Sequence, residues 1–270
     1  MDAKNASDAF SRITSSVTGY LSSLLWPRVD GLKAPRRPHL PTANDVLIVK
    51  DILLSGTKLP LEIIDSIIDH AEYWPHVIAR RELKATARGR PSSGDNIEYL
   101  RTPPLCFDTS DFDSKTSPSL LPARTIHPCR KIVFSISSND QGWSSGGHRG
   151  TFEQSYTWFD VTREPWSPPQ EKGELKHSFL PGPKTLQKNV TAKGEATKHE
   201  ITWNYWDSLD PDSEEAEEQA KKLGRGRATM NGEFVREMEV GDSVVLWARA
   251  RFPGWRNTVH KAEIKLFWAV

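Results

Sequence analysis

Two loop-like stretches of the sequence hold polar and aromatic residues of the kind that bind sugars. One stretch, residues 139–148, is rich in glycine and serine, and the other, residues 255–257, follows a Pro253-Gly254 turn. An indole ring stacks on the apolar face of a pyranose, while amide, carboxylate and guanidinium groups bind its hydroxyls. We therefore predict a ligand site formed by Asp140, Gln141, Trp143, Trp255, Arg256 and Asn257. The alternative is that both indoles plug the ends of a hydrophobic core.

Other reactive residues give weak signals for catalysis. Asp140 with His148, or Asp160 with Glu164, would form an acid–base pair only if the fold brought the two groups together. No His-Glu-x-x-His zinc motif is present, and the segment 224–227 lacks the third glycine of a dinucleotide loop. We predict a protein that is not an enzyme, with no catalytic residue, metal or cofactor. A sugar hydrolase is the enzymatic alternative.

Composition excludes several broad classes. A formal charge of +1 in 270 residues gives no overall field for nucleic acid, and no apolar run is long enough for a membrane span. Cys106 and Cys129 are too few for a disulfide framework and lack neighbouring zinc ligands, so we expect two buried thiols. With no secretory leader, the expected compartment is the cytoplasm or nucleus.

The elements that must position the predicted site read as β-strands. In the run 243–252, alternation places Val244, Leu246 and Ala248 on an inner face and Trp247 and Arg249 on an outer face. Short strand signals separated by turn-rich loops favour an antiparallel sheet pair over a parallel one. The further strand candidates are residues 131–137, 151–160, 177–180, 185–190, 198–206, 233–238 and 262–270. The expected fold is mainly β: an antiparallel, jelly-roll-like β-sandwich over residues 124–270, with a mobile acidic insertion at 207–227.

The N-terminal third has a different composition. Residues 1–42 are rich in Ser, Thr and Pro and are expected to form a disordered tail, although apolar residues between 10 and 26 recur at helical spacing. A helical hairpin is predicted over 43–90, with Asn44 as the cap of its first helix and Pro60 in the first turn of its second. An irregular linker is expected at 91–123.

The second helix opens with Leu59-Pro60-Leu61-Glu62-Ile63-Ile64, which resembles the start of an F-box. The resemblance implies that Leu59, Pro60, Ile63 and Ile64 dock to the small adaptor subunit of a cullin-type ubiquitin ligase. It covers about sixteen residues, and the basic stretch after Pro75 departs from the F-box pattern. The alternative is a hairpin that only packs on the sheet.

Segments 138–143, 155–160 and 250–255 resemble a group of filamentous-fungal proteins that combine a short Leu-Pro-x-Glu helix with a Trp-rich β domain. The overall plan is similar to phloem-lectin-type F-box proteins. These resemblances imply a non-enzymatic interaction protein that recognises a protein or a glycan. A free-standing lectin-like module is the alternative.

Overall fold

A computed structural model describes residues 40–89, 95–108, 119–165, 182 and 184–270. The chain divides into two compact units, residues 1–75 and 76–270. Within the described part, no helix is both long enough and apolar enough to cross a membrane. Of the predicted tail at 1–42, only residues 40–42 are described. The strand candidate at 177–180 lies entirely outside the described residues.

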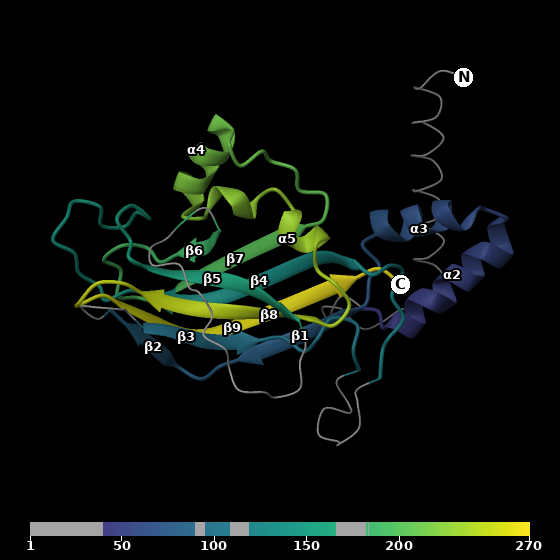
Figure 1. Cartoon of the computed structure of the whole chain (residues 1–270), viewed down its shortest axis with the longest axis horizontal. Coiled ribbons are helices and arrows are strands. Elements are labelled where there is room, and N and C mark those ends of the chain that lie inside the picture. The colour runs from purple at the N-terminus through teal and green to yellow at the C-terminus, as the bar shows by residue number, and fades with distance from the viewer. Residues whose placement is uncertain (1–39, 90–94, 109–118, 166–181, 183) are drawn as a thin grey trace, which may run out of the picture. The chain divides into compact units, whose positions relative to one another are not determined.

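The second unit is a sandwich of two antiparallel sheets (Figure 1). One sheet has the order β1-β9-β4-β7, with β2 also paired to β9, and the other has the order β3-β8-β5-β6. The strands are β1 (His76–Arg81), β2 (Ala85–Arg88), β3 (Asp95–Arg101), β4 (Cys129–Asn139), β5 (Thr157–Pro165), β6 (Thr185–Lys188), β7 (Thr197–Asn204), β8 (Asp242–Ala250) and β9 (Arg256–Trp268). The predicted fold class, mainly β with two antiparallel sheets, is confirmed.

Alternating side chains form the core between the sheets. Ile132, Phe134 and Ile136 of β4 are buried, while the residues between them are partly exposed. Ile264 and Leu266 of β9 follow the same rule, as period-two alternation requires of a half-covered strand. The two cysteines are free and buried, as expected.

β8 departs from the expected alternation, because all of its nine residues are buried. Its outer face carries Trp247 and Arg249, and Arg249 is only 2% exposed. The Arg249 Nε donates to Asp160 Oδ2 at 2.9 Å, and the Trp247 indole donates to Thr162 Oγ1 at 2.9 Å. Partners on β5 thus accept hydrogen bonds from the Arg249 Nε and the Trp247 indole, which the sequence pattern had placed on an outer face.

Three strands lie in segments that were expected to be helical or irregular. β1 and β2 fall inside the predicted helical hairpin at 43–90, and β3 falls inside the predicted linker at 91–123. β1 pairs with the C-terminal half of β9, from His76 opposite Phe267 to Arg81 opposite Ala262. The sandwich therefore begins at residue 76 and not at residue 124.

Two predictions about the region after β7 are also corrected. The segment 207–227 contains a regular helix, α4 (Glu214–Leu223), whose N-cap Ser213 accepts from the backbone N–H of Ala216. Residues expected to form a strand at 233–238 instead form a short helix, α5 (Glu233–Arg236), after Gly232 in the left-handed region at φ +72°. Figure 1 shows α4 and α5 on one side of the sandwich, above β6 and β7.

The first unit contains two helices that contact each other, α2 (Ala43–Thr57) and α3 (Leu61–His70). The cap of α2 is Thr42 and not Asn44: Thr42 and Asp45 form a reciprocal capping box. Lys50 of α2 and Asp65 of α3 form an ion pair at 2.7 Å that joins the two helices.

Candidate functional site

The two predicted site loops meet at one end of the sandwich. β4 ends at Asn139, which pairs with Thr258 near the start of β9. β8 ends at Ala250 and β9 begins at Arg256, so the turn at 251–255 lies at the same end. The segment after β4 and the β8–β9 turn therefore lie together, as the predicted site required.

Four aromatic residues gather there, which we call the aromatic cluster: Trp143, Tyr156, Phe252 and Trp255. Tyr156 makes edge-on contacts with Phe252 at 4.7 Å and with Trp255 at 5.3 Å between ring centroids. Such edge-to-face pairs stabilise beyond their buried area. The sequence pattern had assigned Tyr156 to a strand and Phe252 to an inner face, and neither was predicted as a site residue.

Trp143 is the most exposed member of the cluster. Its side chain is 60% exposed, against 38% for Phe252. One edge of its ring lies against Gly254, where an added Cβ would approach Trp143 Cη2 to 3.2 Å. The indole is therefore supported from the β8–β9 turn while much of its surface remains open to solvent.

Gln141 connects the two loops. Its amide nitrogen donates to the carbonyl of Trp143 at 2.6 Å, and its amide oxygen accepts from the backbone N–H of Arg256 at 3.4 Å. Within the described residues, the Arg256 guanidinium itself has no hydrogen-bond or ion-pair partner. Gln141 is thus occupied with positioning, while Arg256, where β9 begins, offers a cationic group that has no partner among the described residues.

Asp140 has a structural role. It is 1% exposed, and its two carboxylate oxygens accept from the backbone N–H groups of Gly142 at 2.7 Å and Ala192 at 2.6 Å. Burial raises the pKa of this carboxyl, although these backbone donors act in the opposite direction. Its oxygens hold the loop to the neighbouring segment and do not face a ligand.

Asn257 is also internal. Its amide nitrogen donates to the carbonyls of Trp158 at 2.9 Å and Arg249 at 3.3 Å. Its amide oxygen accepts from Asn189, whose own oxygen accepts from Ser138 at 2.7 Å. This buried network links both sheets beneath the aromatic cluster, so Asn257 fixes the site from below.

The same loop contains a pattern associated with nucleophilic serines. Residues 142–146 read Gly-Trp-Ser-Ser-Gly, and His148 Nδ1 pairs with Glu153 at 2.7 Å. A nucleophile elbow requires a turn from a strand into a helix, whereas this segment connects β4 to β5 without one. The Ser144 hydroxyl accepts from the backbone N–H of Gly146, and no hydrogen bond joins it to His148 among the described residues. The arrangement does not amount to a catalytic triad.

The predicted partner-binding residues of the first unit divide by exposure. Pro60 is exposed, Ile63 is 42% exposed and Leu59 is partly exposed. Ile64 is fully buried, together with Ile67 and Ile68. Three of the four predicted residues therefore lie at the surface, and Ile64 belongs to the interior.

Comparison with known proteins adds no assignment: no family model matches this chain, and neither a curated protein nor a solved structure is significantly similar to it.

Proposed function

We propose that this protein is a non-enzymatic recognition module whose sandwich binds a glycan at the aromatic cluster. The observation that carries the proposal is the exposed Trp143 ring, which lies against Gly254 of the β8–β9 turn, with Arg256, whose guanidinium has no partner among the described residues, at the end of the same turn. An accessible indole offers the apolar surface on which a sugar ring stacks, and the guanidinium binds hydroxyl or carboxylate oxygens.

Pre-organisation supports the same proposal. Gln141 bridges the two loops, and the Asn257 network fixes them to both sheets. A site whose side chains are already held in place loses less conformational entropy on binding. Flexible loops carrying the same residues would bind a sugar more weakly.

The test is a glycan array probed with the wild type and with Trp143→Ala, followed by titration of any glycan found. We expect the variant to bind at least roughly thirtyfold more weakly, the loss typical of an aromatic hot spot. Trp206→Ala is a matched control, because Trp206 is also exposed but lies after β7. A wild type that binds no glycan contradicts the proposal, and equal binding by Trp143→Ala contradicts this site.

For the helical unit, we propose docking to the small adaptor subunit of a cullin-type ubiquitin ligase. The supporting observation is that Leu61 and Ile63, within the F-box-like stretch 59–64, are 46% and 42% exposed. α2 adds the exposed aliphatic residues Leu47, Ile48 and Ile52. Exposed aliphatic residues on adjacent helices are typical of a protein-binding surface.

Two neighbouring substitutions separate docking from folding. Ile63→Asp places a charge at an exposed position, so we expect unchanged thermal stability and loss of binding to the purified adaptor. Ile64→Asp buries an unpaired charge and should lower the melting temperature by several degrees. If wild type and Ile63→Asp bind the adaptor equally, or neither binds it, the docking proposal is wrong.

A further inference from the structure

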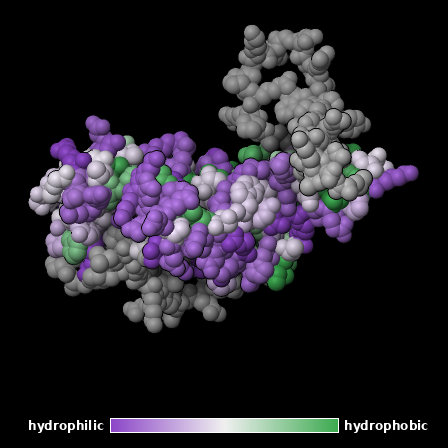
Figure 2. All heavy atoms as spheres, turned by 90° about the horizontal axis from the view of Figure 1, so that it is seen from above, coloured by the Kyte–Doolittle hydropathy of each residue, from purple (hydrophilic) through white to green (hydrophobic). Residues whose placement is uncertain are grey.

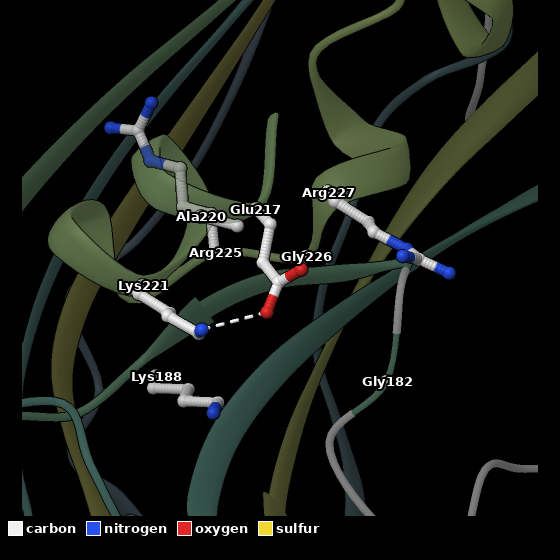
Figure 3. Close-up of a pocket in the computed structure, with 8 residues that line it drawn as sticks. All are labelled: Gly182, Lys188, Glu217, Ala220, Lys221, Arg225, Gly226 and Arg227. Atoms are coloured by element: carbon white, nitrogen blue, oxygen red, sulfur yellow. Dashed lines mark ion pairs between the residues drawn. The ribbon is translucent and has the colours of Figure 1, made fainter. Parts of the chain in front are cut away.

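A hollow on the sandwich unit, away from the aromatic cluster, has cationic side chains as half of its lining residues. It has a volume of about 320 Å³ and lies between β6 and the end of α4 (Figure 3). The lining residues are Gly182, Lys188, Glu217, Ala220, Lys221, Arg225, Gly226 and Arg227. Four of them carry a positive charge and one a negative charge, and the volume matches the lower end of small-molecule sites.

The local sequence explains how these cations come together. Gly224, at φ +68°, ends α4 in the left-handed region, and the chain then turns along β6. The backbone N–H of Lys188 donates to the Gly224 carbonyl at 2.7 Å, and the Gln187 amide donates to the Leu223 carbonyl at 2.9 Å. β6 therefore satisfies carbonyls at the negative end of α4, which lessens the repulsion of an anion there.

Two of the cations are partly buried without a carboxylate beside them. Lys188 has no hydrogen-bond or ion-pair partner for its amine within the described residues, and burial lowers its pKa. The Arg225 guanidinium donates only to neutral oxygens, Gln187 Oε1 at 3.3 Å and the Glu200 carbonyl at 3.0 Å, and burial lowers its pKa too. Figure 3 shows the Arg225 guanidinium directed away from Lys188 and from the Lys221–Glu217 pair, so Lys188 is the buried cation that faces the hollow. Burying a cation without an anion is unfavourable, and an anion bound beside Lys188 would remove that penalty.

The remaining charges are held loosely at the rim. Lys221 pairs with Glu217 at 2.7 Å along one helix face, and Arg227 approaches the exposed Asp212 at 3.5 Å. Figure 3 shows the Lys221–Glu217 pair with Lys188 on one side and Arg227 on the other. Exposed pairs of this kind contribute little to stability, so their cations are available to a competing anion.

We propose that this pocket binds a phosphate-bearing small molecule. Phosphate carries more charge than a carboxylate and has several acceptor oxygens that lysine and arginine can share. Without Arg225, the lining still carries the three cations Lys188, Lys221 and Arg227 against Glu217, and an excess of positive charge matches a multiply charged anion better than a single carboxylate. Figure 2, which views the molecule from above Figure 1, shows this side of the sandwich as mostly hydrophilic, as a polar ligand requires.

The probe for the test is inorganic pyrophosphate, titrated calorimetrically into the full chain at low ionic strength. We expect saturable binding that weakens as salt is added, because the attraction is screened. Lys188→Gln should bind roughly tenfold or more weakly, the loss of one charge-assisted hydrogen bond. Its melting temperature should not fall, because Lys188 has no described partner to lose.

Two further variants sharpen the result. Lys222→Gln is the matched control for Lys188→Gln. It also removes one lysine charge, but Lys222 lies in α4 directly after Lys221 and does not line the hollow. Glu217→Gln removes the one carboxylate among the described lining residues, so it should strengthen binding. The proposal is overturned if the wild type shows no saturable binding, if Lys188→Gln equals Lys222→Gln, or if Glu217→Gln weakens binding.

A phosphate group can also belong to a lipid headgroup, and a vesicle arm distinguishes the two sources. Sedimentation with phosphatidylcholine vesicles that contain a phosphoinositide should leave the protein in the supernatant while soluble pyrophosphate binds. Vesicle binding without pyrophosphate binding would overturn the small-molecule proposal.

Discussion

At the scale of single residues, hydrogen bonds decide which polar groups at the aromatic end can meet a ligand. Asp140 and Asn257 use their polar atoms on buried internal partners, and Gln141 uses its amide to join two loops. Trp143 and Arg256 keep their surfaces free among the described residues. The first three residues are therefore engaged within the protein, and only the last two offer groups that the proposed ligand could contact.

Replacing Asp140 tests this division. In Asp140→Asn, one carboxylate oxygen becomes an NH₂ group that faces the backbone N–H of Gly142 or Ala192. We expect a loss of about 1–3 kcal/mol in the free energy of unfolding, measured by urea denaturation. Glu195→Gln is the control, since Glu195 is exposed in the segment that follows Ala192. An Asp140→Asn protein as stable as this control would contradict the structural role.

His199 provides a pH-dependent prediction. It is buried on β7, and its pKa is lowered to about 4 by burial, with Arg225 and Lys193 adding repulsion. Between about pH 6.5 and 4 the unfolded chain binds a proton that the folded chain does not, so stability is lost as pH falls through this range.

The measurement is urea denaturation of the wild type and His199→Leu between pH 7 and 4. The variant should lose less stability than the wild type on acidification, by at most about 3 kcal/mol. His127→Asn is the control, because His127 is exposed. Parallel curves for the wild type and His199→Leu would show that His199 does not contribute.

At the scale of elements, the sequence predicted the sandwich but not its edge. The sequence pattern identified β4, β7, β8 and β9: residues of β4, β7 and β9 alternate between buried and more exposed, while β8 is a strand whose nine residues are all buried. β1 and β2 contain several arginines and pair only with β9 among the described strands. At a sheet edge, cationic side chains remain solvated and protect the strand from further pairing. The same residues therefore resembled a solvated helix in the sequence.

For the candidate site, the sequence predicted where the loops lie but not which of their polar groups are free. The pairing of β4 with β9 brings the segment after β4 and the β8–β9 turn to one end of the sandwich, which was one of the arrangements compatible with the predicted strands. Which polar groups remain free depends on distant partners such as Ala192 and Asn189, and no local pattern reveals them. The hollow beside α4 was missed because it needs a helix that the acidic composition of 207–227 did not predict.

The β8–β9 turn supports Trp143 through Gly254, and this contact can be tested. Gly254 has φ +88°, so Gly254→Ala combines backbone strain with crowding of the Trp143 ring at 3.2 Å. Gly150→Ala is the matched control: its φ is +81°, but nothing lies within 4 Å of the added Cβ. We expect both to destabilise by about 1 kcal/mol from strain. Only Gly254→Ala should also change the fluorescence of Trp143, and equal spectra would contradict the contact.

At the scale of the whole sandwich unit, the two sheets are tied together by buried contacts that do not belong to either sheet alone. The network through Asn189 and Asn257 joins residues of β4, β8 and β9. All nine residues of β8 are buried, so both faces of this strand are covered by other parts of the protein. Elements that share a buried interior in this way are expected to unfold together.

The two free cysteines report on this cooperativity. Cys129 begins β4 in one sheet, and Cys106 follows β3 of the other sheet; both side chains are 1% exposed. Burial raises the pKa of both thiols, that of Cys129 to about 12, so neither forms the reactive thiolate in the folded protein.

The variants Cys106→Ala and Cys129→Ala each leave one thiol, whose reaction with a thiol reagent can be followed separately as urea is added. Both thiols should become reactive at the urea concentration at which the unit unfolds. Earlier labelling of Cys106 than of Cys129 would show that the sheet containing β3 opens on its own.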